Sequence, residues 1–156
     1  MLKINIIYSS IGGNTLLVVQ KITQLLEQNT IIPVALNLYR VDNCNPDVVN
    51  DCDCVILASP TYGQGSLEAH FPSFLRQITT KIVNQKFAVV GLGDNHYYPE
   101  YLTESGAILE TFVKNNAGIL VVPALRIGMP PIKFINKLVP KWVEKLIAEL
   151  HIPKPI

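Results

Sequence analysis

The sequence predicts an α/β fold with a doubly wound, five-stranded parallel sheet in the order 2-1-3-4-5 and helices on both faces. Strand-like apolar runs alternate with amphipathic segments along all 156 residues. This alternation is typical of parallel sheets with right-handed crossovers. Polar, glycine-bearing loops also follow the first, third and fourth runs. In doubly wound sheets, ligands bind at that end of the strands.

The expected strands are short, apolar and rich in β-branched residues. They span residues 4–8, 31–39, 54–58, 87–92 and 119–125. Pro33, near the start of the second run, predicts an edge strand, because proline cannot donate to a sheet ladder. The third run, CVILA, is apolar throughout and predicts a strand that is buried on both faces.

The expected helices lie between these runs and after them. One begins near Thr15, a short one opens at Pro46, and longer ones span residues 67–78, 103–115 and 132–150. Proline removes a helical hydrogen bond. Pro72 therefore predicts a late start or a kink in its helix, and Pro140 predicts a kink or a break.

Length and composition predict a single compact domain over residues 1–156. Hydrophobic residues make up 49% of the chain and charged residues 16%, which excludes a disordered protein. The net charge of +1 favours no nucleic-acid partner. No apolar run approaches the roughly 20 residues of a membrane span. The first residues lead directly into a strand, so we expect no signal peptide and a cytoplasmic, monomeric protein.

The cysteines predict free thiols. Cys44, Cys52 and Cys54 are odd in number and clustered, which does not fit a disulfide framework. Cys52 and Cys54 could supply half of a metal site, but the chain has no second cysteine pair. We therefore expect reduced thiols and no metal.

The stretch KINIIYSSIGGNT, residues 3–15, predicts a strand, a glycine-rich hydroxyl loop and the start of a helix. Backbone N–H groups at such a helix start bind anions, and phosphate is the common one. The loop lacks the Gly-Lys-Ser/Thr of triphosphate-binding loops and the third glycine of the dinucleotide fingerprint. It suits one terminal phosphate. From this loop alone, an ordinary capped turn is an equally good interpretation.

The three special loops have the sequences SSIGGNT at residues 9–15, SPTYGQGSLEAHFPSFL at 59–75 and GLGDNHYYPEYL at 91–102. In the predicted strand order they converge on one crevice. The chain has no G-x-S-x-G turn that would indicate a Ser-His-Asp hydrolase. Together the loops resemble the short-chain flavodoxins, over nearly the whole chain. The resemblance implies a flavodoxin-like fold, bound flavin mononucleotide (FMN), and transient redox partners, a reductase and an acceptor enzyme.

The resemblance also implies roles for individual residues. The first loop would hold the FMN phosphate, although Gly12 stands where the family usually has Thr or Ser; Ser9 or Ser59 would then compensate. Tyr62 would cover the inner face of the flavin, and the Gly63 peptide would flip toward the reduced ring. The third loop would supply the outer aromatic. The implied cofactor-binding residues are Ser9, Ser10, Ile11, Gly12, Gly13, Asn14, Thr15, Ser59, Pro60, Thr61, Tyr62, Gly63, Gln64, Gly93, Asp94, Asn95, Tyr97 and its rival Tyr98.

Other functions stay open at this stage. A flavin enzyme or activator of the same fold, such as a quinone reductase or a ribonucleotide reductase partner, is one alternative; a binding module without flavin is another. The charges predict a dipolar molecule that is acidic near the flavin and basic on the last helix. The acidic residues are Glu68, Asp94, Glu100 and Glu104, and the basic ones are Lys133, Lys137, Lys141 and Lys145.

Overall fold

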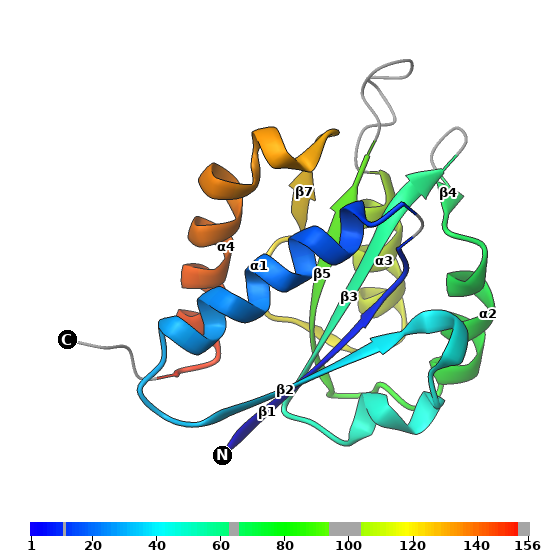
Figure 1. Ribbon diagram of the computed structural model, residues 1–156. Helices are drawn as coiled ribbons and strands as arrows, with labels where there is room; N and C mark the ends of the chain where they lie inside the picture. Colours follow the sequence, from blue (N-terminus) through cyan, green and yellow to red (C-terminus); the bar gives the residue numbers. More distant parts are fainter. Residues whose placement is uncertain (11, 63–65, 94–103, 153–156) are drawn as a thin grey trace.

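A parallel sheet forms the centre of the computed structural model, which describes residues 1–10, 12–62, 66–93 and 104–152 (Figure 1). The strands are β1 (Leu2–Tyr8), β2 (Val34–Arg40), β3 (Cys54–Tyr62), β4 (Ser66–Leu67), β5 (Lys86–Leu92), β6 (Ile119–Leu120) and β7 (Leu125–Ile127). Their order is β2-β1-β3-β5-β6, with β7 also beside β5; the short β4 pairs with the end of β3 in the antiparallel direction. Since β6 and β7 take the place of the fifth expected strand, the predicted order is confirmed.

The last expected strand, residues 119–125, is divided in the structure. β6 pairs with the start of β5, and β7 pairs with its end, Val90–Leu92. Pro123 lies between the two pieces, and its carbonyl accepts a hydrogen bond from Nε1 of Trp142 at 3.0 Å. Proline has no N–H for the ladder, so the chain leaves the sheet here and returns at Leu125.

Charged side chains cover the sheet edge beside this break. Oε2 of Glu110 accepts a hydrogen bond from the backbone N–H of Ala124 at 3.2 Å. Oε1 of the same carboxylate lies 3.2 Å from Nη2 of Arg126 in β7. The opposite edge is β2, as Pro33 predicts.

Helices cover both faces of the sheet (Figure 1). One face carries α1 (Asn14–Gln28) and α4 (Ile135–Glu149), the other α2 (His70–Ile78) and α3 (Glu104–Asn115). Short 3₁₀ turns are η1 (Val41–Asn43), η2 (Pro46–Asn50) and η4 (Pro131–Lys133). The late start that Pro72 predicts is confirmed, because α2 begins at His70. First-turn N–H groups have no partner within a helix, so Pro72 removes no helical bond there.

The break that Pro140 predicts does not occur, because α4 is continuous from Ile135 to Glu149. Buried side chains along the helix, among them Val139, Val143 and Leu146, hold it against the sheet. That packing outweighs the one hydrogen bond that proline removes.

The core lies on both sides of the sheet, because successive strand side chains point to opposite faces. Ile6 and Ile56 pack with α1 and α4, whereas Ile7 and Leu57 pack with α2 and α3. All four are fully buried. Each such side chain contributes about 1.5–3 kcal/mol to folding. The sheet therefore presents the carboxyl ends of its central strands as a rigid platform.

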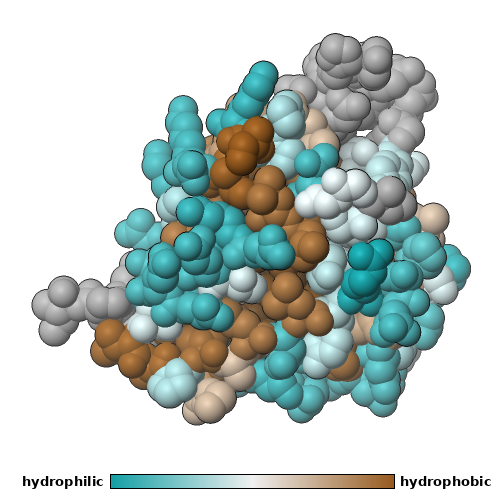
Figure 2. Space-filling model, viewed as in Figure 1, coloured by the Kyte–Doolittle hydropathy of each residue, from teal (hydrophilic) through white to brown (hydrophobic). Residues whose placement is uncertain are grey.

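Figure 2 shows apolar side chains gathered in the middle of the face drawn there, over α1 and β2. The large apolar residues exposed on these two elements are Leu17 and Leu38. Such exposure is common on protein surfaces. Within the described ranges, no helix has both the length and the apolar character that are needed to cross a membrane.

Candidate functional site

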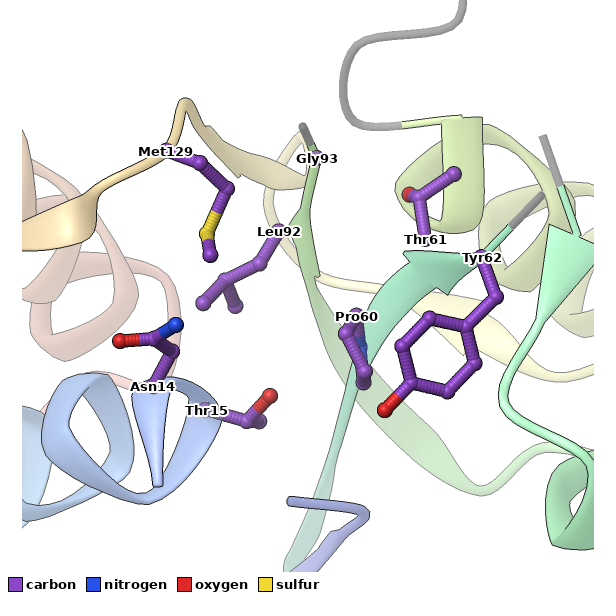
Figure 3. A pocket seen from close by; sticks show the side chains of 8 residues that line it. All are labelled: Asn14, Thr15, Pro60, Thr61, Tyr62, Leu92, Gly93 and Met129. Atoms are coloured by element: carbon purple, nitrogen blue, oxygen red, sulfur yellow. The ribbon is translucent and has the colours of Figure 1, made fainter. Parts of the chain in front are cut away.

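A crevice of about 150 Å³ lies at the carboxyl ends of the central strands (Figure 3). Its lining comes from the start of α1, the end of β3, the end of β5 and the turn after β7. The lining residues are Asn14, Thr15, Pro60, Thr61, Tyr62, Leu92, Gly93 and Met129. The loops after the first and third expected strands thus meet the end of the fourth, at the switch point where doubly wound sheets bind ligands.

The backbone before α1 is open enough for a ligand to approach closely. Gly12 and Gly13 have φ angles of +81° and +86°, a left-handed conformation that side chains rarely adopt. A Cβ added at either position would meet no atom within 4 Å. The first turn of α1 holds no acidic residue that would repel an anion. The loop is therefore an uncharged cradle at the positive end of a helix dipole.

The cradle offers several hydrogen-bond donors. Among the described residues, no hydrogen bond engages the backbone N–H of Asn14 or Thr15, or the hydroxyl of Thr15. The side chain of Thr15 is 1% exposed and extends from α1 toward Pro60 (Figure 3). Ser10 is engaged differently, because its Oγ accepts a hydrogen bond from the N–H of Leu16 at 3.2 Å. Ser10 thus closes the first turn, and its own hydroxyl proton can still be donated.

The two serines expected to compensate for Gly12 differ in the structure. The hydroxyl proton of Ser59 is already used: Oγ donates to the carbonyl of Pro60 at 2.9 Å and accepts from the N–H of Glu68 at 3.3 Å. No hydrogen bond among the described residues engages the hydroxyl of Ser9, whose N–H donates to the carbonyl of Ala58 at 3.1 Å. Of the two serines, Ser9 is therefore the one whose hydroxyl can donate a hydrogen bond to a ligand.

Tyr62 is the last residue of β3 and lies half-buried at one side of the crevice. Pro60 lies between Tyr62 and the side chains of Leu92 and Met129 (Figure 3). Burial raises the pKa of its phenol, and the negative charge of Glu68 raises it further. Tyr62 is therefore neutral at physiological pH. It presents an apolar ring with a polar tip, as expected of a ring that stacks on a flat ligand.

Glu68 is placed differently from the expectation of an exposed carboxylate at the ligand edge. Its side chain is only 2% exposed, while that of His70 is 58% exposed. The Glu68 carboxylate accepts from the N–H of His70 at 3.0 Å, and Nδ1 of His70 lies 2.6 Å from Oε1. Glu68 is thus a buried, partnered group at the start of α2, and the acidic half of the predicted dipole loses one exposed charge.

The remaining expected residues divide into two groups. Pro60, Thr61 and Gly93 line the crevice. Ile11, Gly63, Gln64, Asp94, Asn95, Tyr97 and Tyr98 lie outside the described residues.

Sequence reasoning missed two lining residues, Leu92 and Met129. Leu92 belongs to an apolar strand end, and Met129 lies in a Gly-Met-Pro-Pro turn that carries no ligand motif. The signal that could have found Met129 is its place directly after the last strand, at the same edge of the sheet.

The three cysteines lie away from the crevice and are free thiols. Burial raises the pKa of Cys44 and Cys52 to about 11 and that of Cys54 to about 12. Among the described residues, no cluster of three or more His, Cys, Asp or Glu side chains could hold a metal ion.

These thiols should alkylate slowly. Only the thiolate reacts, and a thiol of pKa about 11 is ionised roughly 100-fold less at pH 8 than an ordinary cysteine. Because a more basic thiolate is also more nucleophilic, we expect iodoacetamide to modify Cys44 and Cys52 about 10-fold more slowly than glutathione, with rates that still rise between pH 8 and pH 10. Mass spectrometry of timed samples, with glutathione as the reference thiol, measures this. A rate that levels off near pH 9 would contradict it.

Comparisons with known proteins give the family of this chain. Residues 6–131 match the family model described as flavodoxin. A flavodoxin of Buchnera aphidicola is 30% identical over 122 residues, which are 77% of this chain and 68% of that protein. A short-chain flavodoxin associated with a bacterial microcompartment superposes with a TM-score of 0.85 at 17% identity, covering 96% of this chain and 99% of that one. A Fusobacterium nucleatum flavodoxin bound to FMN superposes with a TM-score of 0.82 at 18% identity, covering 96% and 99%. From the family match over most of its length and the relative at 30% identity, we conclude that the chain belongs to the flavodoxin family.

Proposed function

We propose that this protein is an electron carrier that binds FMN in the crevice and passes electrons between a reductase and acceptor enzymes. The observation that carries the proposal is a set of donors at the start of α1 that have no partner among the described residues and that face a crevice with Tyr62 at its other side. FMN, when bound, accepts and donates electrons one at a time. The protein's part is to bind it, to orient it and to control its contact with water.

The cradle residues fit the phosphate of FMN. The N–H groups of Asn14 and Thr15, with the hydroxyls of Thr15 and Ser10, would donate to phosphate oxygens at the helix start. The glycines before α1 leave room for the phosphate, because no side chain occupies that space. Ser9 would supply the hydroxyl that Gly12 lacks. The charge of the phosphate is met by donors and the helix dipole, without a cationic side chain in this loop.

The walls of the crevice fit a flat, largely apolar ring. Tyr62 would cover one face of the ring, and Leu92 and Met129 would provide apolar surface across the crevice. Such walls limit water around the ring. Because a charged reduced ring is less stable in apolar surroundings, they favour the uncharged forms.

The partners are redox proteins that dock transiently, and the protein acts as one cytoplasmic, monomeric domain. The basic side chains Lys137, Lys141 and Lys145 are exposed on α4, while Lys133 lies in η4. Because Glu68 is buried, an acidic flavin edge would rest on Glu104 and on residues outside the described part of the chain. A partner that carries positive charge would approach that edge.

Three measurements test the function. The purified protein should be yellow, and a reductive titration should proceed in two separate one-electron steps. Calorimetry should show that the apoprotein binds FMN much more tightly than riboflavin, which has the same ring without phosphate. Direct two-electron reduction would instead favour a flavin enzyme of the same fold. Failure to bind FMN would favour a binding module without flavin. Equal affinity for FMN and riboflavin would contradict the phosphate cradle.

A further inference from the structure

Two hydroxyl side chains connect β3 to the start of α3. The Thr61 hydroxyl donates to Oγ of Ser105 at 2.9 Å, and its Oγ1 accepts from the Ser105 N–H at 3.0 Å. The Ser105 hydroxyl donates to the carbonyl of Ser59 at 2.9 Å. Ser105 is fully buried. The three bonds join residues that are 44 to 46 positions apart in the sequence.

These bonds lie at and just beyond the point where the pairing of β3 with β5 ends. The pairing of β3 with β5 ends at Pro60 opposite Leu92, yet β3 continues to Tyr62. Beyond Pro60, β4 pairs with one side of β3, Thr61 opposite Leu67 and Tyr62 opposite Ser66. Ser105 supplies hydrogen bonds to Ser59 and Thr61 in addition. The last residues of β3, including Tyr62, are thus held by β4 and by α3.

The contact between α3 and β5 leaves little room for adjustment. A Cβ on Gly91 would lie 2.4 Å from the backbone N of Gly106 and 2.9 Å from Oγ of Ser105. The start of α3 therefore rests directly on the backbone of β5. Ser105 is fixed by that contact, and through it Thr61 is tied to the end of β5.

We propose that Thr61 and Ser105 are positioning residues that hold Tyr62 in place for the flavin ring. The proposal rests on the proposed function. Ordering a binding wall before the ligand arrives reduces the entropy lost on binding, so a held Tyr62 raises FMN affinity. The Thr61–Ser105 pair also fixes the backbone of β3 directly before Tyr62, where the flavin ring would be contacted. It therefore influences the redox potentials as well as affinity.

A purely structural hydroxyl pair would act otherwise. It would lower stability when removed but would leave FMN affinity and redox potentials unchanged. Thr79 provides the matched control, because its hydroxyl donates to the carbonyl of Leu75 at 2.9 Å near the end of α2, away from the crevice. Thr79→Val removes one hydroxyl hydrogen bond of the same length as the Thr61–Ser105 bond.

The experiment compares Thr61→Val, Ser105→Ala, their double variant, Thr61→Ser and Thr79→Val. Calorimetry gives the Kd for FMN, spectroelectrochemistry gives the midpoint potentials, and hydrogen exchange of the apoproteins gives the protection of the Tyr62 amide. We expect Thr61→Val and Ser105→Ala each to raise Kd about 5- to 10-fold. The double variant should add little, because both changes break the same network. Thr61→Ser should restore affinity and potentials, and Thr79→Val should change neither.

The outcomes separate this proposal from the proposed function. Unchanged Kd and potentials in Thr61→Val and Ser105→Ala would overturn it, as would an equal loss in Thr79→Val. If the wild-type protein binds no FMN, the proposed function fails and this role fails with it. Hydrogen exchange then still shows whether the pair orders Tyr62, because protection of that amide should fall in Thr61→Val and not in Thr79→Val.

Discussion

Replacing Gly91 by alanine should lower the free energy of unfolding by about 3 kcal/mol, the upper part of the range for overpacked sites. The added Cβ would lie 2.4 Å from the backbone N and 2.7 Å from the Cα of Gly106. Both are backbone atoms of α3, so the helix would have to move away from β5. That movement would also disturb the bonds of Ser105. Urea denaturation of the apoprotein at pH 7, followed by circular dichroism, measures the loss.

The control for this variant is Gly106→Ala, at the other side of the same contact. A Cβ on Gly106 would point at Cγ of Arg126 at 3.4 Å and Cβ of Ala124 at 3.5 Å, which are ordinary contacts. Alanine is also favoured over glycine in a helix by about 1 kcal/mol. Gly106→Ala should therefore equal or exceed the wild type in stability. Similar losses in both variants would show that the close contact is not the cause.

The other large effect is expected on ligand affinity. Thr15→Val should raise the Kd for FMN by about 10- to 100-fold, since a hydrogen bond to a charged group contributes about 1.5–3 kcal/mol. Thr15 is 1% exposed, and its hydroxyl has no partner among the described residues. Valine has nearly the same shape, so packing at the start of α1 is preserved and only the donor is lost.

Riboflavin is the internal control for Thr15→Val, because it carries the ring without the phosphate. Fluorescence titration of the apoprotein should give the same Kd for riboflavin in wild type and variant. A parallel loss for both ligands would mean that valine distorts the crevice as a whole. An unchanged Kd for FMN would remove Thr15 from the phosphate contacts.

The general architecture could be predicted from the sequence because its causes are local. Neighbouring residues alone determine the periodicity of strands and helices and show where polar loops follow apolar runs. Pro33 predicted the edge strand for the same reason, since the missing N–H belongs to the residue itself. Asn14, Thr15 and Tyr62 could be placed in one crevice because strand order brings their loops together.

Other features depend on contacts between distant residues. Among the described residues, the hydrogen bonds to the Glu68 carboxylate come from His70, two residues along the chain, but its burial depends on the fold around it and gives no sign in the sequence. Ser105 resembles any serine near a helix start, and its partners lie 44 and 46 residues away. Pro140 was expected to kink or break α4, but the helix is not broken, because its buried face holds it against the sheet. In each case tertiary packing overrides the local preference.

The covered sheet edge at β7 bears on how the protein behaves at high concentration. An exposed edge strand offers unpaired N–H and C=O groups to a strand of another molecule, which is a common route to aggregation. Here the edge is divided into β6 and β7, and the N–H of Ala124 is already bonded to the Glu110 carboxylate. An incoming strand would have to displace that carboxylate and separate it from Arg126. The interruption of the last strand thus guards this side of the sheet against intermolecular strand pairing.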